Sequence, residues 1–122
     1  DWGRPASAGR QLHIEQSKRV SKPWLRPQFA PMVKRVPNGS FRVLGCEYFE
    51  LVLVDSDGIA IERDTHRRSF ETVTVILGAA ELVSEGGRLP LGRFESAVVP
   101  AATGAYRLES TEPFRALVSL VP

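Results

Sequence analysis

The chain has 122 residues, of which 43% are hydrophobic and 25% charged, and its net charge is +2. These values are typical of one soluble globular domain that buries its own core. No apolar run approaches the roughly 20 residues that cross a membrane, and no signal-peptide pattern opens the chain, so we expect a cytoplasmic protein. The single cysteine, Cys46, excludes an internal disulfide, and we expect it to be a buried, inert thiol.

The small net charge conceals an uneven distribution. Residues 1–46 carry nine Lys and Arg against two acids, whereas residues 47–122 carry seven Arg against twelve acids. A basic arm can bind nucleic acid, but these basic residues are scattered among prolines and lack aromatic residues on which bases would stack. We therefore expect no nucleic-acid partner and no membrane partner, and a solvated surface whose two halves attract each other.

The first 37 residues are predicted to form a linker helix and a proline-rich strap. Gln11–Val20 is the only plausible helix, with a poor apolar stripe, and the Ser21-Lys22-Pro23 segment ends it. Trp24–Pro37 contains Pro27, Pro31 and Pro37, which favour an extended strap across a barrel. Its predicted anchors to the core are Trp24, Phe29 and Met32.

Residues 38–122 are predicted to form a β-barrel domain, because short β-branched runs alternate with glycine and proline turns. The turn signals include Asn38-Gly39 and the Asp55–Gly58 segment, where a calcium loop is disfavoured because the remaining ligands are missing. A charged loop is expected over Arg63–Arg68. The expected strands are Ser40–Leu44, Glu47–Val54, Ile59–Glu62, Phe70–Leu77, Ala80–Ser84, Leu89–Leu91, Phe94–Val99, Ala105–Glu109 and Phe114–Val121. Eight or nine such strands indicate an all-β jelly-roll barrel.

Two stretches of the sequence carry a family resemblance. Ser69–Ala101 contains a strand ending in Val-Ile-Leu-Gly, a glycine turn, and a strand ending in Glu-Ser-Ala-Val-Val-Pro-Ala. Upstream, Asp1-Trp2-Gly3-Arg4 is followed by Leu12-His13-Ile14-Glu15. Together they resemble the C-terminal cupin half of a type I mannose-6-phosphate isomerase of the short bacterial form. One departure is Phe94, which stands where family members usually carry glycine.

The resemblance implies a cupin-like jelly-roll barrel, or double-stranded β-helix, that is part of a longer enzyme. The first residue, Asp1, is not a methionine, which agrees with that expectation. In this family zinc and the catalytic arginine belong to segments preceding the stretch seen here, and the enzyme interconverts mannose 6-phosphate and fructose 6-phosphate. The implied partners are the N-terminal catalytic cupin half and, in the full enzyme, a sugar phosphate. By resemblance, Arg4 is the candidate substrate-binding residue, and an exposed loop arginine without a role is the alternative.

The residues themselves argue against a metal site in this barrel. A typical cupin metal site uses two histidines one residue apart, a nearby glutamate and a histidine on a later strand. This chain has only His13 and His66, and Ala105-Tyr106 stands where the late histidine would be expected. Glu62, His66 and Glu71 could gather one ion, but a solvated loop histidine is the preferred interpretation. We therefore expect this chain to bind no metal and to provide no catalytic residue.

Three functional hypotheses remain open. The first is a structural, non-metal C-terminal domain of mannose-6-phosphate isomerase, inactive when isolated. The second is a free-standing, non-catalytic cupin that binds a sugar or regulates a partner. The third is a cupin enzyme such as a sugar epimerase, which would need a histidine base inside the barrel; His66 is expected in a loop.

Overall fold

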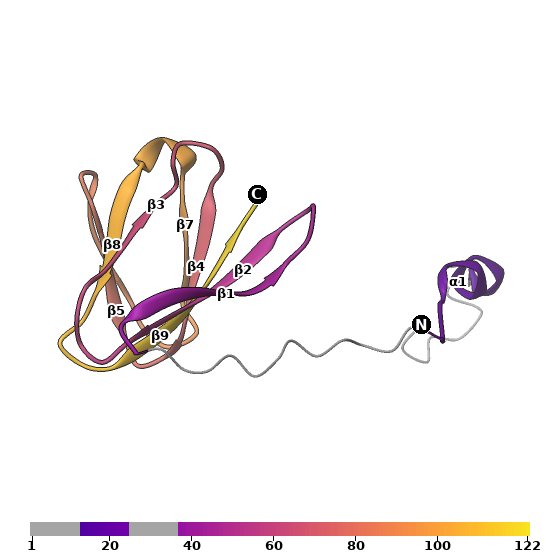
Figure 1. The fold of residues 1–122 in the computed structure, drawn as a ribbon, viewed down its shortest axis with the longest axis horizontal. Helices are drawn as coiled ribbons and strands as arrows, with labels where there is room; N and C mark the ends of the chain where they lie inside the picture. The colour runs from indigo at the N-terminus through magenta and orange to yellow at the C-terminus, as the bar shows by residue number, and fades with distance from the viewer. Residues whose placement is uncertain (1–12, 25–36) are drawn as a thin grey trace, which may run out of the picture.

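The computed structural model of the chain describes residues 13–24 and 37–122. Its strands form two antiparallel sheets that face each other around a single hydrophobic core (Figure 1). The all-β jelly-roll prediction is therefore confirmed. None of the helices in the described ranges is long and apolar enough to span a membrane.

The larger sheet has the strand order β1-β2-β9-β4-β7, and the smaller has the order β3-β8-β5-β6. The larger sheet consists of β1 Gly39–Gly45, β2 Glu50–Ser56, β9 Phe114–Leu120, β4 Glu71–Leu77 and β7 Ser96–Val99. The smaller sheet consists of β3 Ile61–Asp64, β8 Ala105–Glu109, β5 Ala80–Ser84 and β6 Gly87–Leu91. A short 3₁₀ helix, η2 Ala101–Thr103, joins β7 to β8.

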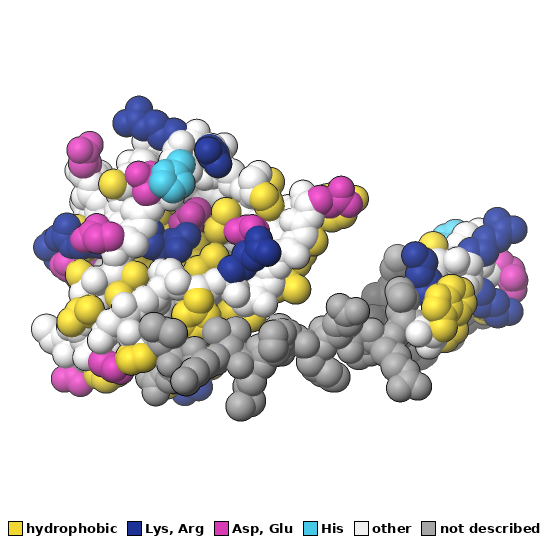
Figure 2. Space-filling model, viewed as in Figure 1, with side chains coloured by type: hydrophobic (Ala, Val, Ile, Leu, Met, Phe, Trp, Pro, Cys, Tyr) yellow, Lys and Arg dark blue, Asp and Glu magenta, His cyan; other side chains and the backbone are white. Residues whose placement is uncertain are grey.

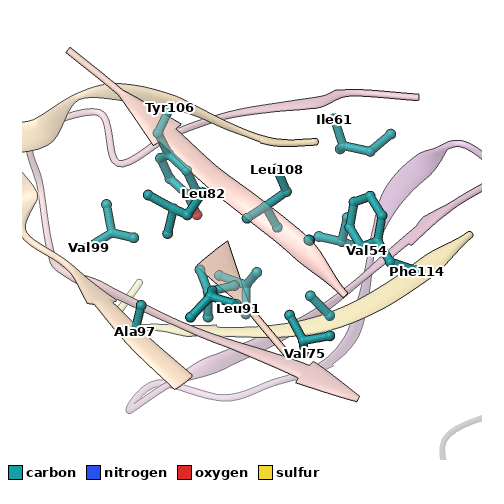
Figure 3. Close-up of a cluster of buried hydrophobic side chains, with 14 of the residues drawn as sticks. Val54, Ile61, Val75, Leu82, Leu91, Ala97, Val99, Tyr106, Leu108 and Phe114 are labelled. Atoms are coloured by element: carbon teal, nitrogen blue, oxygen red, sulfur yellow. The ribbon is translucent and has the colours of Figure 1, made fainter. Parts of the chain in front are cut away.

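Alternation along each strand decides which side chains enter the core, because successive residues point to opposite faces. In β4, for example, Glu71, Val73 and Val75 are buried while the intervening threonines are partly exposed. Valines, leucines and one tyrosine from both sheets fill the space between them (Figure 3). The pattern is that of a two-sheet barrel with one solvated face on each sheet.

Two turns show how local sequence closes the barrel. Gly78, between β4 and β5, has a φ of +68°, and a Cβ atom at this position would collide with the carbonyl oxygen of Pro113. Glycine is therefore required there. Phe94, in the turn before β7, also has a positive φ of 69° although it has a side chain. It adopts the backbone conformation that favours glycine, so the turn forms with a side chain at this position.

Several strand boundaries differ from the predictions. Glu47–Phe49 was expected to open a strand but lies in the turn between β1 and β2, and β2 continues through Asp55 and Ser56. Cys46 lies in the same turn and is exposed, so the prediction of a buried thiol is wrong. The strand predicted at Ile59 begins at Ile61 and runs to Asp64, so Arg63 belongs to β3 and not to a charged loop.

The N-terminal predictions are only partly within the described residues. Helix α1 spans Ile14–Val20, inside the predicted helix, and all of its residues are exposed. Trp24 is 74% exposed, so it does not anchor a strap to the core as predicted. The other predicted anchors, Phe29 and Met32, lie outside the described residues, as does most of the predicted strap.

Candidate functional site

A buried cluster of charged and polar side chains joins the two sheets. Arg63 of β3 donates from Nε and Nη2 to the two carboxylate oxygens of Glu71 in β4, at 3.1 and 2.9 Å. The hydroxyl of Tyr106 in β8 donates a short hydrogen bond to Glu71 Oε2 and accepts one from Arg63 Nε at 3.1 Å. The side chains of Arg63 and Glu71 are only 12% and 4% exposed. We call these three residues the interior cluster.

Strand register explains why these residues meet. Arg63 pairs with Tyr106 across β3 and β8, so both side chains leave the smaller sheet on the same face. Glu71 pairs with Leu120 and Val99, whose side chains lie on the core-facing side of the larger sheet. Figure 3 shows the Tyr106 ring pointing inward beside Leu82. The cluster therefore spans the gap between the sheets at one end of the core.

Burial and charge pairing shift the pKa values of this cluster. Burial opposes the charge of Arg63, but its hydrogen bond and charge interaction with Glu71 outweigh that cost and raise the pKa of Arg63. Burial, assisted by the hydrogen bond to Glu71, raises the pKa of Tyr106 far above its ordinary value of 10.0. Tyr106 is therefore a neutral hydrogen-bond donor, and the Arg63 charge compensates the Glu71 charge. No described buried side-chain nitrogen or oxygen lacks a hydrogen-bond partner.

A cavity of about 240 Å³ opens at this end of the barrel. It is formed by the starts of β2 and β4, the end of β9 and the loop between β3 and β4. Acidic and basic side chains and a histidine gather on the barrel face seen in Figure 2. We call the cavity of about 240 Å³ the mouth cavity. Its charged and ionisable lining residues are Glu50, Asp64, His66, Arg68 and Glu71.

Thr65 fixes the loop that forms one wall of the mouth cavity. Its buried hydroxyl donates to the carbonyl oxygen of Ala101 at 2.7 Å and accepts from the amide of Gly104 at 3.2 Å. Its backbone amide donates to the Gly104 carbonyl at 3.1 Å. The next two residues, His66 and Arg67, have positive φ angles of 50° and 55°. Non-glycine residues seldom adopt this conformation, so these hydrogen bonds maintain a conformation that costs free energy.

The structure separates the three residues considered for a metal ion. Glu71 is buried in the interior cluster, Glu62 is exposed, and the side chain of His66 is 72% exposed at the mouth. Nδ1 of His66 lies 3.8 Å from Asp64 Oδ2. Within residues 13–24 and 37–122, no group of three His, Cys, Asp or Glu side chains is arranged to hold a metal ion. His66 also does not lie inside the barrel, where the hypothesis of a histidine base would need it.

The structure tests the predictions for Arg4 and for the residues of the interior cluster to different extents. Arg4 lies outside the described residues, so its substrate-binding role stays a prediction. Tyr106 occupies the position after Pro100 where a metal-binding barrel was expected to carry its late histidine, and its hydroxyl contacts Glu71. Arg63 was not expected to be an interior residue. Its two-residue spacing from the buried Ile61 is the alternation signal that would have identified it.

Comparisons with solved structures agree on the fold. The chain is similar to an RmlC-like cupin protein from Desulfovibrio desulfuricans, with 21% identity, a TM-score of 0.58, and coverage of 68% of this chain and 80% of that chain. KdgF from a Halomonas species matches with 22% identity, a TM-score of 0.58, and coverage of 68% and 78% respectively. The DMSP lyase DddQ from Ruegeria pomeroyi matches with 18% identity, a TM-score of 0.57, and coverage of 68% and 46%.

No protein-family model matches the chain, and no curated protein sequence matches it. The structural likenesses show that residues of this chain form a domain with the cupin fold. Their names cover varied functions, and nothing in them points to mannose-6-phosphate isomerase. The fold part of the resemblance is therefore confirmed, and the enzyme assignment stays a proposal.

Proposed function

We propose that this cupin domain is non-catalytic and binds a small polyhydroxylated ligand, such as a sugar, in the mouth cavity. The observation that carries the proposal is a concave site bordered by Glu71, whose carboxylate is already paired with Arg63. The Glu71 carboxylate accepts hydrogen bonds from both Arg63 and Tyr106, so it is engaged and is poorly suited to act as a general base. The rim, by contrast, offers polar groups around a hollow, which is the usual form of a ligand site.

The size and lining of the cavity favour a small polar ligand over an extended one. A volume of about 240 Å³ is below the range of roughly 300–1,000 Å³ typical of sites for drug-sized ligands. Carboxylate oxygens of Glu50 and Asp64 are hydrogen-bond acceptors suited to ligand hydroxyl groups, and Arg68 and His66 supply donors. Leu120 and Val121 add apolar surface on which a sugar carbon skeleton can lie.

Thermal unfolding of the full chain tests this function. We expect a neutral polyol or monosaccharide, from a series extending from erythritol to mannose, to raise the melting temperature in a saturable way by mass action on the native state. Glu50→Gln at the mouth should weaken that response, whereas Glu85→Gln, in the exposed β5–β6 turn, should retain it. If no polyol stabilises the protein, or if both variants respond alike, the proposed function is wrong.

A second candidate function is the C-terminal, non-metal domain of mannose-6-phosphate isomerase. The observation that favours it is that the stretch carrying the resemblance, residues 69–101, contains strands β4 to β7 in the expected order. In that case zinc and the catalytic groups would belong to an N-terminal half, and Arg4 would contact the sugar phosphate. We expect this chain alone not to isomerise mannose 6-phosphate; zinc-dependent activity of the isolated chain would contradict both candidate functions.

A further inference from the structure

The charges around the mouth cavity are not all compensated. Arg63 is paired with Glu71, and Arg42 donates to Glu50 at 2.7 Å. Arg68 lines the same cavity, is exposed, and has no ion-pair partner among the residues that the structure describes. The Arg68 guanidinium is thus available to a ligand in the cavity, whereas Arg63 and Arg42 are engaged with the lining carboxylates Glu71 and Glu50.

The backbone that leads to Arg68 is held in place. The Arg68 amide donates to the Thr65 carbonyl at 3.1 Å, and the Arg67 amide donates to the Thr65 hydroxyl at 3.3 Å. Thr65 itself is attached to the segment around η2 by its buried hydroxyl. His66 and Arg67 both adopt left-handed conformations, and these hydrogen bonds hold the backbone that leads to Arg68. An ordered backbone lowers the conformational entropy that this loop loses when the Arg68 side chain binds a ligand.

We propose that the ligand of the mouth cavity is a small hydroxycarboxylate, whose carboxylate pairs with Arg68. This inference rests on the proposed function and adds the charge of the ligand. A guanidinium presents parallel N–H donors that match the two oxygens of a carboxylate. Glu50 and Asp64 then accept hydrogen bonds from the ligand's hydroxyl groups. At roughly 30 Å³ for each water-sized group, a cavity of about 240 Å³ suits a ligand with a short carbon chain.

The lining acids limit how much negative charge the ligand carries. Glu50, Asp64 and Glu71 all border the cavity, and Arg68 is the unpaired arginine among the described lining residues. A ligand with several negative charges would face repulsion from these carboxylates, which one guanidinium does not offset. A monocarboxylate with neutral hydroxyl groups matches both the Arg68 guanidinium and the acceptor oxygens of the cavity lining.

Isothermal titration with matched ligands tests the proposal on the full chain. Erythronate and erythritol share a four-carbon hydroxylated skeleton and differ in the carboxylate, and butyrate has the carboxylate without hydroxyl groups. We expect erythronate to bind about tenfold more tightly than erythritol or butyrate, as one charged hydrogen-bonded contact predicts. Arg68→Gln should remove that preference. Arg93→Gln is the matched control, since Arg93 is another exposed arginine without an ion-pair partner in the described part of the chain and does not line the cavity.

The outcomes separate this inference from the proposed function. If erythronate and erythritol bind equally well, or if Arg93→Gln reduces the preference as much as Arg68→Gln does, the carboxylate assignment is overturned while polyol binding stands. If neither ligand binds and the wider polyol series also fails, both are overturned. Preferential binding of erythronate that is lost only in Arg68→Gln supports the inference.

Discussion

The Arg63–Glu71 pair is the residue-scale feature with the greatest energetic consequence. Removing one partner of a buried ion pair leaves an uncompensated charge, so we expect Glu71→Gln to lower the free energy of unfolding by about 3–5 kcal/mol. Replacing both residues, in Arg63→Met combined with Glu71→Gln, should cost much less than the sum of the single changes. Urea unfolding of Arg63→Met, Glu71→Gln and the double variant measures this coupling. Additive losses of the free energy of unfolding would show that the pair does not act as a unit.

Tyr106 makes the stability of the domain sensitive to alkaline pH. Burial, and then the hydrogen bond to Glu71, raises the pKa of Tyr106, so the folded state binds this proton more tightly than the unfolded state does. Its contribution is fully present below the ordinary pKa of 10.0 and is lost as the pH rises above it towards the folded-state pKa. We expect Tyr106→Phe to unfold with a shallower loss of stability above pH 10. Parallel chemical-denaturation curves across alkaline pH test this, and identical slopes would refute it.

Phe94 stores backbone strain at a turn. A non-glycine residue in the left-handed region costs roughly 1–2 kcal/mol, and Phe94 has a φ of 69°. Phe94→Ala loses the aromatic ring but keeps the conformational cost. Phe94→Gly loses the ring and also removes the conformational cost. We therefore expect Phe94→Gly to be about 1 kcal/mol more stable than Phe94→Ala, even though glycine increases the entropy of the unfolded chain. A lower melting temperature for the glycine variant would contradict this interpretation.

At the scale of elements, the β3–β4 loop depends on one side chain. The Thr65 hydroxyl bonds to Ala101 and Gly104, so Thr65→Val leaves those backbone groups without this partner. We expect a loss of about 1–3 kcal/mol in the free energy of unfolding. Thr65→Ser keeps the hydroxyl and should retain most of the stability. Hydrogen exchange at the Gly104 amide gives a local readout, since it should accelerate in the valine variant and stay slow in the serine variant.

The sequence predicted the positions of the strands better than it predicted the environment of individual residues. Ala80–Ser84 and Ala105–Glu109 were predicted at their observed bounds, because β-branched or alternating runs there end at glycine or polar turns. Glu47–Phe49 was assigned to a strand because Glu47–Val54 partly alternates polar and apolar residues, but the hairpin turn occupies that position. Cys46 was expected to be a buried thiol because it is the only cysteine and can form no internal disulfide, but its place in the turn exposes it.

The interior cluster could be predicted only in part. Glu71 lies on the same face of β4 as the buried Val73 and Val75, and this alternation is visible in the sequence. Its partners, however, come from the opposite sheet, and only the packing of the two sheets brings Arg63 and Tyr106 to it. The mouth cavity could not be predicted from local patterns, since it combines β2, β4, β9 and a loop that are distant in the chain.

At the scale of the whole molecule, the domain has two different ends. One end contains the interior cluster and the mouth cavity, where β2, β4 and β9 begin or end. The opposite end of the strands includes Gly78 and the Asp57–Ile59 turn, where Ser56 bonds to the backbone of Gly58 and Ile59. Binding in the mouth cavity should therefore affect the first of these ends and leave the opposite end unchanged.

The most direct test of this account is a two-dimensional amide NMR titration of the labelled chain with erythronate. We predict shifts at the amides of Thr65–Ser69 and Glu71, at the border of the mouth cavity, and unchanged signals at Gly58 and Gly78. Arg68→Gln should raise the erythronate concentration needed for half-maximal shifts about tenfold, to that needed for erythritol, and Arg93→Gln should leave it unchanged. Shifts confined to the opposite end, or no shift with erythronate or any polyol tested, would contradict the claim that the mouth of this cupin-fold domain binds a ligand.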